Sequence, residues 1–87
     1  MLTVYTKTHC PYCDQAKALL KQKGVEFTAV NIEENPDMRT WLMEQGHRSV
    51  PQIYMDDKIF VEGGFQGLAK LSDVELHQRL GDISVSN

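Results

Sequence analysis

The chain has 87 residues, of which 41% are hydrophobic and 24% charged, so it has the size and composition of one globular domain and not of a fibre or a disordered segment. Its net charge of −3 argues against a nucleic-acid partner, because phosphate backbones are bound by basic surfaces. No stretch approaches the roughly 20 apolar residues that cross a bilayer, and the start of the chain lacks a secretion signal, so we expect neither membrane insertion nor export and a cytoplasmic location.

Apolar periodicity and turn residues predict strands and helices in a single order along the chain. Helices are expected where apolar residues recur every three or four positions before a glycine, and strands where β-branched and aromatic residues cluster between turn signals. The predicted elements are a strand from Leu2 to Tyr5, a helix from Pro11 to Lys23, a strand over 25–32, a helix from Pro36 to Gln45, strands over 50–55 and 59–61, a short helix over 65–71, and a last helix that Gly81 ends.

This order predicts an α/β fold with a four-stranded mixed sheet flanked by helices. The first strand–helix–strand unit requires a parallel pair with a right-handed crossover, and the two strands around Asp56-Asp57 form an antiparallel hairpin. Ser72 and Glu75 have the spacing of a capping box at the start of the last helix. Trp41, Leu42 and Met43 are expected to pack the second helix onto the sheet. We expect one domain over residues 1–82 and a frayed tail over 83–87.

The two cysteines lie in the run Cys10-Pro11-Tyr12-Cys13. A disulfide that closes so short a loop would stabilise the fold only weakly, so a structural role does not explain the pair. Cys10 is expected at the N-cap of the first helix, where unpaired N–H groups and the helix dipole stabilise a thiolate and Lys7 adds a positive charge. Cys13, one turn further in, faces the core. The spacing therefore predicts Cys10 as an acidic, attacking thiol and Cys13 as the resolving thiol.

A zinc site is the alternative interpretation of the cysteine pair, with ligands from His9, His47 or His77. A complete zinc site usually needs four clustered ligands, and these histidines show no paired spacing. A Cys-x-x-Cys that opens a helix after a strand is typical of redox proteins, so we expect disulfide chemistry and no metal.

Three segments resemble the dithiol glutaredoxins in the right order. The run from Tyr5 to Cys13 with the helix that follows is similar to the active-site segment of that family, residues 49–54 are similar to its Thr-Val-Pro segment, and Gly63-Gly64 corresponds to its glycine pair. The resemblance covers roughly residues 2–80. It implies a thioredoxin-like fold, a cis peptide bond before Pro51, and a glutathione-dependent oxidoreductase that reduces protein disulfides and glutathionylated mixed disulfides.

The resemblance also implies a groove for glutathione beside Cys10. Lys7 would meet the glycyl carboxylate of glutathione, Val50 would pair with its cysteine backbone, and the glycine pair would leave the groove open. The implied glutathione-binding residues are Lys7, Tyr12, Arg39, Val50, Pro51, Gly64, Phe65 and Gln66. Glutathione would serve as reductant, no tightly bound cofactor is expected, and the protein would act as a monomer on disulfide-containing protein substrates.

Two departures from the family bear on glutathione. Where the family usually has Gln or Arg, this chain has Met38 with Arg39 adjacent, and Arg39 is the candidate substitute. After the glycine pair, Phe65-Gln66-Gly67 replaces residues of which one is usually an aspartate that holds the γ-glutamyl ammonium. We therefore expect weaker glutathione binding than is usual in the family.

Two alternatives from the same resemblance stay open. In one, the protein is a redoxin that takes electrons from thioredoxin reductase and passes them to ribonucleotide reductase. In the other, Cys10 thiols of two subunits and two glutathiones hold a [2Fe–2S] cluster, an arrangement that Pro11 disfavours because cluster-binding relatives often carry a smaller or more flexible residue there.

Overall fold

The computed structural model describes the backbone of residues 2–85 and the side chains of residues 2–81. In chain order its elements are β1 (Leu2–Thr6), α1 (Pro11–Gln22), β2 (Phe27–Asn31), α2 (Pro36–Glu44), β3 (Gln52–Met55), β4 (Lys58–Val61), α3 (Gly64–Ala69) and α4 (Asp73–Val85). Both the predicted order and the thioredoxin-like class with a four-stranded mixed sheet are confirmed. Within the described residues no helix is both long and apolar enough to cross a membrane.

The sheet has the strand order β2-β1-β3-β4. β1 runs parallel to β2, with Leu2 opposite Phe27, and antiparallel to β3, with Val4 opposite Ile53. β3 and β4 form the predicted hairpin, in which Asp56 adopts a positive φ of 57° at the turn. β1 is therefore a central strand, and the loop that follows it leads directly to Cys10.

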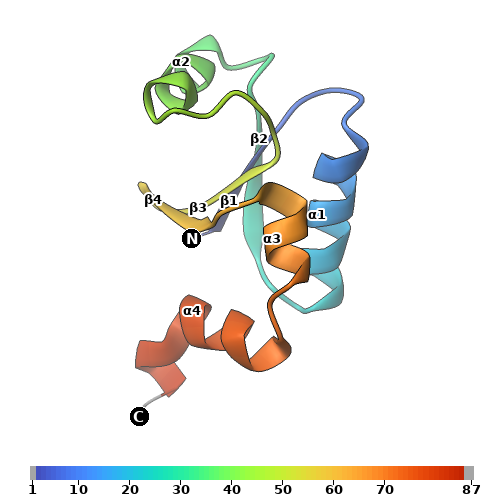
Figure 1. Ribbon diagram of the computed structural model, residues 1–87, viewed down its shortest axis with the longest axis vertical. Coiled ribbons are helices and arrows are strands. Elements are labelled where there is room, and N and C mark those ends of the chain that lie inside the picture. The colour runs from blue at the N-terminus through green and yellow to red at the C-terminus, as the bar shows by residue number, and fades with distance from the viewer. Residues whose placement is uncertain (1, 86–87) are drawn as a thin grey trace.

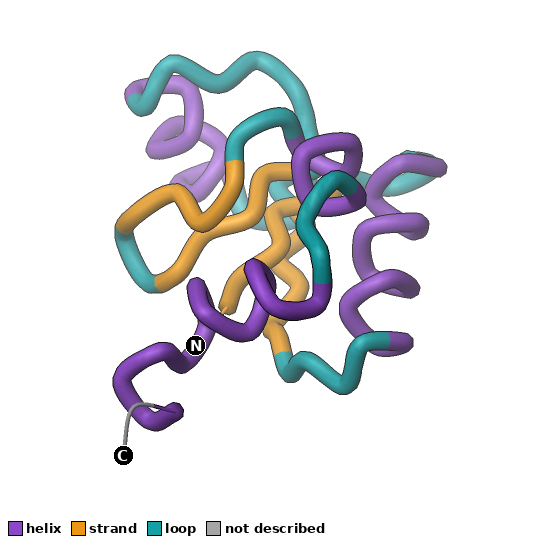
Figure 2. The backbone as a smooth tube through the Cα atoms, turned by 60° about the horizontal axis from the view of Figure 1, so that its bottom comes forward, coloured by secondary structure: helices purple, strands orange, loops and turns teal. Residues whose placement is uncertain are grey.

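Helices cover both faces of the sheet (Figures 1 and 2). Successive residues of a strand point to opposite faces, so β1 sends Leu2 and Val4 to one side and Tyr5 to the other. Leu2 and Val4 join a core with residues of α1, α3 and α4, whereas Tyr5 packs with Tyr54, Leu42 and, less deeply buried, Trp41 beneath α2. The expected packing of α2 is thus confirmed for Leu42 and Trp41. Met43 faces away and is 61% exposed, because α2 contacts the sheet along one stripe only.

The last helix breaks at Gly81, as predicted. Gly24 and Gly46 follow their helices with left-handed φ values of 73° and 92°, whereas Gly81 has the non-helical values φ −149° and ψ 34°, and a second helical segment follows this kink and runs to Val85. The predicted fraying of the tail stays a prediction, and residues 86–87 lie outside the described residues. The capping box is confirmed, since Ser72 and Glu75 exchange hydrogen bonds of 3.0 and 3.1 Å.

Candidate functional site

Cys10 is the N-cap of α1, as the sequence predicts. Its backbone is extended, with a φ of −116° and a ψ of 99°, and Pro11 occupies the first helical position. The Sγ atom of Cys10 accepts a hydrogen bond from the backbone N–H of Cys13 across 3.3 Å, and its S–H group points toward the carbonyl oxygen of Val50 at 3.8 Å. A sulfur placed this way receives an N–H that has no partner within the helix, which favours a negative charge on the sulfur.

Cys13 lies on the core-facing side of α1 and is fully buried. Burial raises the pKa of its thiol, and a hydrogen bond with Cys10 raises it further, although the Thr6 hydroxyl and the Lys7 backbone act in the opposite direction. Cys13 therefore keeps its proton more readily than an exposed cysteine does. The two sulfur atoms occupy different environments within one helical turn, and this difference supports different roles for them.

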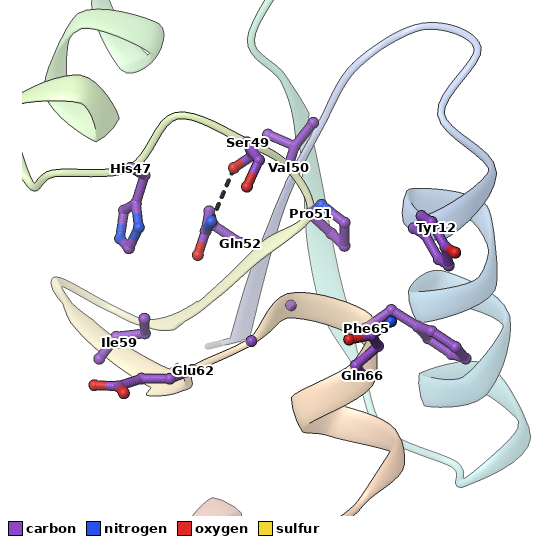
Figure 3. A pocket seen from close by; sticks show the side chains of 12 residues that line it. Tyr12, His47, Ser49, Val50, Pro51, Gln52, Ile59, Glu62, Phe65 and Gln66 are labelled. Atoms are coloured by element: carbon purple, nitrogen blue, oxygen red, sulfur yellow. Dashed lines mark hydrogen bonds between the residues drawn. The ribbon is translucent and has the colours of Figure 1, made fainter.

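The peptide bond between Val50 and Pro51 is cis, as the resemblance implies. Pro51 is buried and lies against Gly64, where an added Cβ would stand 2.8 Å from the Pro51 carbonyl oxygen. Because Gly64 also has a left-handed φ of 59°, this position requires glycine on two grounds. The Gln52 side chain stabilises the loop before Pro51, since its Nε2 donates a hydrogen bond of 2.8 Å to the carbonyl oxygen of Ser49 (Figure 3).

A groove of about 560 Å³, here called the proline groove, runs along Pro51 (Figure 3). It is lined by Tyr12, His47, residues 49–52, Ile59 and residues 62–66. Figure 3 shows Tyr12 and Phe65 at one end, His47 at the other, and Pro51 between them. The rings of Tyr12 and Phe65 stack with centroids 6.2 Å apart, so the end that belongs to α1 and α3 is aromatic.

A second groove of about 660 Å³, here called the cationic groove, adjoins the proline groove at Val50. It is lined by Lys7, Ile32, Glu33, Arg39, Leu42, Met43 and residues 46–50. The two grooves share His47, Ser49 and Val50. Lys7, Arg39 and Arg48 make the second groove positive, whereas the proline groove has Glu62 as its one acidic residue and no lysine or arginine among the described lining residues.

The residues predicted to bind glutathione are distributed over these two grooves. Lys7 and Arg39 line the cationic groove, Val50 lines both, and the other five line the proline groove: Tyr12, Pro51, Gly64, Phe65 and Gln66. The fold therefore brings all eight to two grooves that share Val50, whose carbonyl oxygen lies 3.8 Å from the Cys10 sulfur. Their roles in binding stay predictions.

Sequence reasoning missed several lining residues. Glu33 and Arg48, which line the cationic groove, and Glu62, which lines the proline groove, belong to no motif, and nothing in the sequence indicates that these separate loops border a groove. His47, which the sequence offers as a zinc ligand, instead places its Nε2 2.5 Å from the hydroxyl oxygen of the buried Tyr54. Burial raises the pKa of that hydroxyl, so Tyr54 keeps its proton more readily than an exposed tyrosine does. Within residues 2–81 no three histidine, cysteine or acidic side chains gather closely enough to hold a metal ion.

The segment after the glycine pair has no room for a side chain at Gly67. A Cβ on this residue would overlap the carbonyl oxygen of Glu62. An aspartate at this position is therefore sterically excluded. Position 66 is the alternative place for a carboxylate, because the Gln66 side chain is exposed and lines the proline groove.

Comparisons with known proteins agree with this geometry. The family model of the glutaredoxins matches residues 2–61. Glutaredoxin 3 of Escherichia coli K12 is 46% identical over 54 residues, which are 61% of this chain and 65% of that relative, so the match stops short of two thirds of its length. The glutaredoxin-like protein NrdH of Lactococcus lactis MG1363 is 38% identical over 74 residues, which are 83% of this chain and all of that relative.

Solved structures show the same fold. A buckwheat glutaredoxin in complex with glutathione superposes with a TM-score of 0.75 at 27% identity, covering 95% of this chain and 78% of its own. The NrdH-redoxin of Escherichia coli, described as having a thioredoxin-like activity profile, superposes with a TM-score of 0.62 at 28% identity. The superposition covers 64% of this chain and 74% of the NrdH-redoxin chain. The chain is thus similar both to glutaredoxins and to NrdH proteins.

Proposed function

Because this chain belongs to the glutaredoxin family, whose members are thiol oxidoreductases, we propose that it uses glutathione to reduce protein disulfides and glutathionylated proteins, with Cys10 as attacking and Cys13 as resolving thiol. One observation carries the assignment of roles. Both cysteines are buried, but the Cys10 sulfur accepts the backbone N–H of Cys13 at the start of α1, whereas deeper burial and the hydrogen bond with Cys10 raise the pKa of the Cys13 thiol. Only Cys10 has a sulfur whose negative charge the helix start favours.

The reaction takes place at the two sulfur atoms in turn. The Cys10 thiolate attacks one sulfur of the substrate disulfide, a Cys10–substrate disulfide forms, and the other substrate sulfur leaves as a thiolate that takes up a proton. Cys13 then loses its proton and attacks the Cys10 sulfur, which forms the Cys10–Cys13 disulfide and releases the second substrate thiol. Two glutathione molecules restore the dithiol and are together oxidised to glutathione disulfide.

The charges of the two grooves support glutathione as the reductant. Its glycyl carboxylate complements Lys7 and Arg39 in the cationic groove, and its γ-glutamyl end would extend along the proline groove past Pro51. Val50 borders both grooves and its carbonyl oxygen lies 3.8 Å from the Cys10 sulfur, so a ligand bound through that sulfur would cross Val50.

A second candidate function differs in the electron source. Here thioredoxin reductase reduces the Cys10–Cys13 disulfide, and the dithiol supplies ribonucleotide reductase. The match to an NrdH protein over all of that relative favours this candidate. Phe65 also favours it, because this aromatic residue, stacked on Tyr12, stands after the glycine pair where glutaredoxins usually have a small or acidic residue. The [2Fe–2S] cluster alternative, the domain boundary at residue 82, the monomeric state and the cytoplasmic location stay predictions.

The test feeds the oxidised protein from two electron sources. One reaction contains NADPH, glutathione reductase and glutathione, the other NADPH and thioredoxin reductase, and both contain a protein disulfide as substrate. We expect NADPH consumption with glutathione, and none with the Cys10→Ser variant as the matched control. Consumption with thioredoxin reductase alone would instead assign the second function.

A further inference from the structure

The cationic groove contains one carboxylate, that of Glu33, among the side chains that the structure describes there. Glu33 belongs to the loop between β2 and α2, whereas Lys7, Arg39 and Arg48 come from the loop after β1, from α2 and from the loop after α2. The topology thus places a fixed negative group inside a groove whose other charged residues are positive. The role proposed above for Lys7 and Arg39, to bind a carboxylate, leaves this acidic residue unexplained.

Hydrogen bonds hold Glu33 in place. Its Oε1 accepts the backbone N–H of Thr8 across 3.1 Å, and its own N–H donates to Oδ1 of Asn31 across 2.8 Å. Asn31 also donates from Nδ2 to the Thr8 hydroxyl oxygen across 3.2 Å. The Glu33 and Asn31 side chains therefore both hydrogen-bond to Thr8, which follows Lys7 in the loop that leads to Cys10, and this holds the Glu33 carboxylate at that loop.

Glu33 is also an anion at neutral pH. The Thr8 hydroxyl and then the Thr8 N–H hydrogen-bond its carboxylate and lower its pKa, and the positive charge of Lys7 lowers it further. The remaining charged and titratable groups that line the groove are Arg39, Arg48 and His47, none of them acidic. A carboxylate that enters the groove therefore meets both the cations and one permanent anion.

We propose that Glu33 is a specificity residue that opposes the binding of a carboxylate in the cationic groove and so favours ligands that carry an uncharged amide there. The proposal rests on glutathione binding as proposed above, and it acts through the competition of Glu33 with the glycyl carboxylate for Lys7 and through repulsion between the two anions. A protein substrate continues as an amide where glutathione ends in a carboxylate. Glu33 thereby raises the affinity of the groove for peptide chains relative to its affinity for free glutathione.

The experiment compares two ligands in a Cys13→Ser background, in which the mixed disulfide accumulates. One ligand is glutathione disulfide and the other is the disulfide of glutathione amide, whose glycyl carboxylate is a carboxamide. In both reactions the Cys10 thiolate attacks the ligand disulfide, forms a mixed disulfide and releases one ligand thiol. Mass spectrometry at several ratios of thiol to disulfide gives the equilibrium constant of each exchange.

Glu33→Gln is the informative variant, because glutamine keeps an oxygen that accepts the Thr8 N–H and removes the charge. Glu34→Gln is the matched control, since Glu34 is also exposed, is the next residue and does not line the groove. We expect Glu33→Gln to raise the equilibrium constant for glutathione roughly two- to five-fold, to leave that for glutathione amide within about twofold, and to lose this difference in 1 M salt. Glu34→Gln should change neither.

Two kinds of outcome overturn the inference. An equal change for both ligands would assign Glu33 a purely structural role at Thr8, and a fall in the glutathione constant would show that it positions Lys7 for binding. Either result leaves glutathione binding intact. Absence of a mixed disulfide with both ligands would instead overturn the proposed function and the inference together.

Discussion

The backbone N–H of Cys13 donates a hydrogen bond of 3.3 Å to the sulfur of Cys10, while the sulfur of Cys13 is itself buried. Cys13 thus stabilises the attacking sulfur through its backbone N–H and carries the resolving sulfur in its side chain. Because the backbone group remains when the side chain is changed, the two contributions can be separated by mutation.

This separation predicts unequal losses in two serine variants. Cys10→Ser should abolish reduction of every disulfide, because no other thiolate replaces it. Cys13→Ser keeps the N–H that supports Cys10, so it should retain reduction of glutathionylated peptides and lose reduction of protein disulfides. Steady-state rates on the two substrates measure this, and equal losses on both would contradict the assigned roles.

The raised pKa of Cys13 predicts a loss of stability at alkaline pH. A thiol whose folded-state pKa is raised holds its proton more tightly when folded, so its contribution to stability is complete below the ordinary value of about 8.5 and disappears as pH rises through the folded-state value. The free energy of unfolding of the reduced protein should therefore fall above about pH 8.5. Denaturant titrations between pH 7 and 10 measure it, and Cys13→Ala should show a shallower fall than the parent protein.

The contact between Gly64 and Pro51 predicts that two glycine substitutions differ. Gly24 and Gly64 both have a positive φ, 73° and 59°, but a Cβ at Gly24 would have open space, whereas one at Gly64 would press on the Pro51 carbonyl. Gly24→Ala should cost about 1–2 kcal/mol for backbone strain alone. Gly64→Ala should cost at least about 1 kcal/mol more and lower kcat/KM, because Pro51 has to move. Equal unfolding free energies for the two variants would show that the loop at Pro51 yields freely.

Gln66 is the position at which a carboxylate can restore a contact to the γ-glutamyl ammonium. Gly67 is excluded by the Glu62 carbonyl, and Gln66 is exposed, lines the proline groove and lies near the start of α3. Gln66→Asp should lower the glutathione concentration for half-maximal rate several-fold, up to about tenfold, with little change in the maximal rate. Gln66→Asn controls for side-chain length. If the aspartate and asparagine variants require the same glutathione concentration, the ammonium is already held by another group.

Local sequence patterns were enough to predict the element order, the position of Cys10 at a helix start and the capping box at Ser72. These features depend on residues within a few positions of one another, and periodicity, N-caps and turn residues report such local geometry directly. Resemblance to a family added the cis bond before Pro51, which the dipeptide alone would not have shown. Met43 marks the limit of local patterns, because the burial of a helix face depends on what lies beside it.

Which distant residues share a groove depends on the packing of the whole fold. The strand order β2-β1-β3-β4 sets the loops after β1 and β2 side by side, and this brings Glu33 to Thr8 and Lys7. The close approach of α3 to the end of β4 decides that Gly67 has no room for a side chain, whatever residue the family carries there. Charge, steric fit and groove shape act through space, and the chain positions of the residues involved carry no record of them.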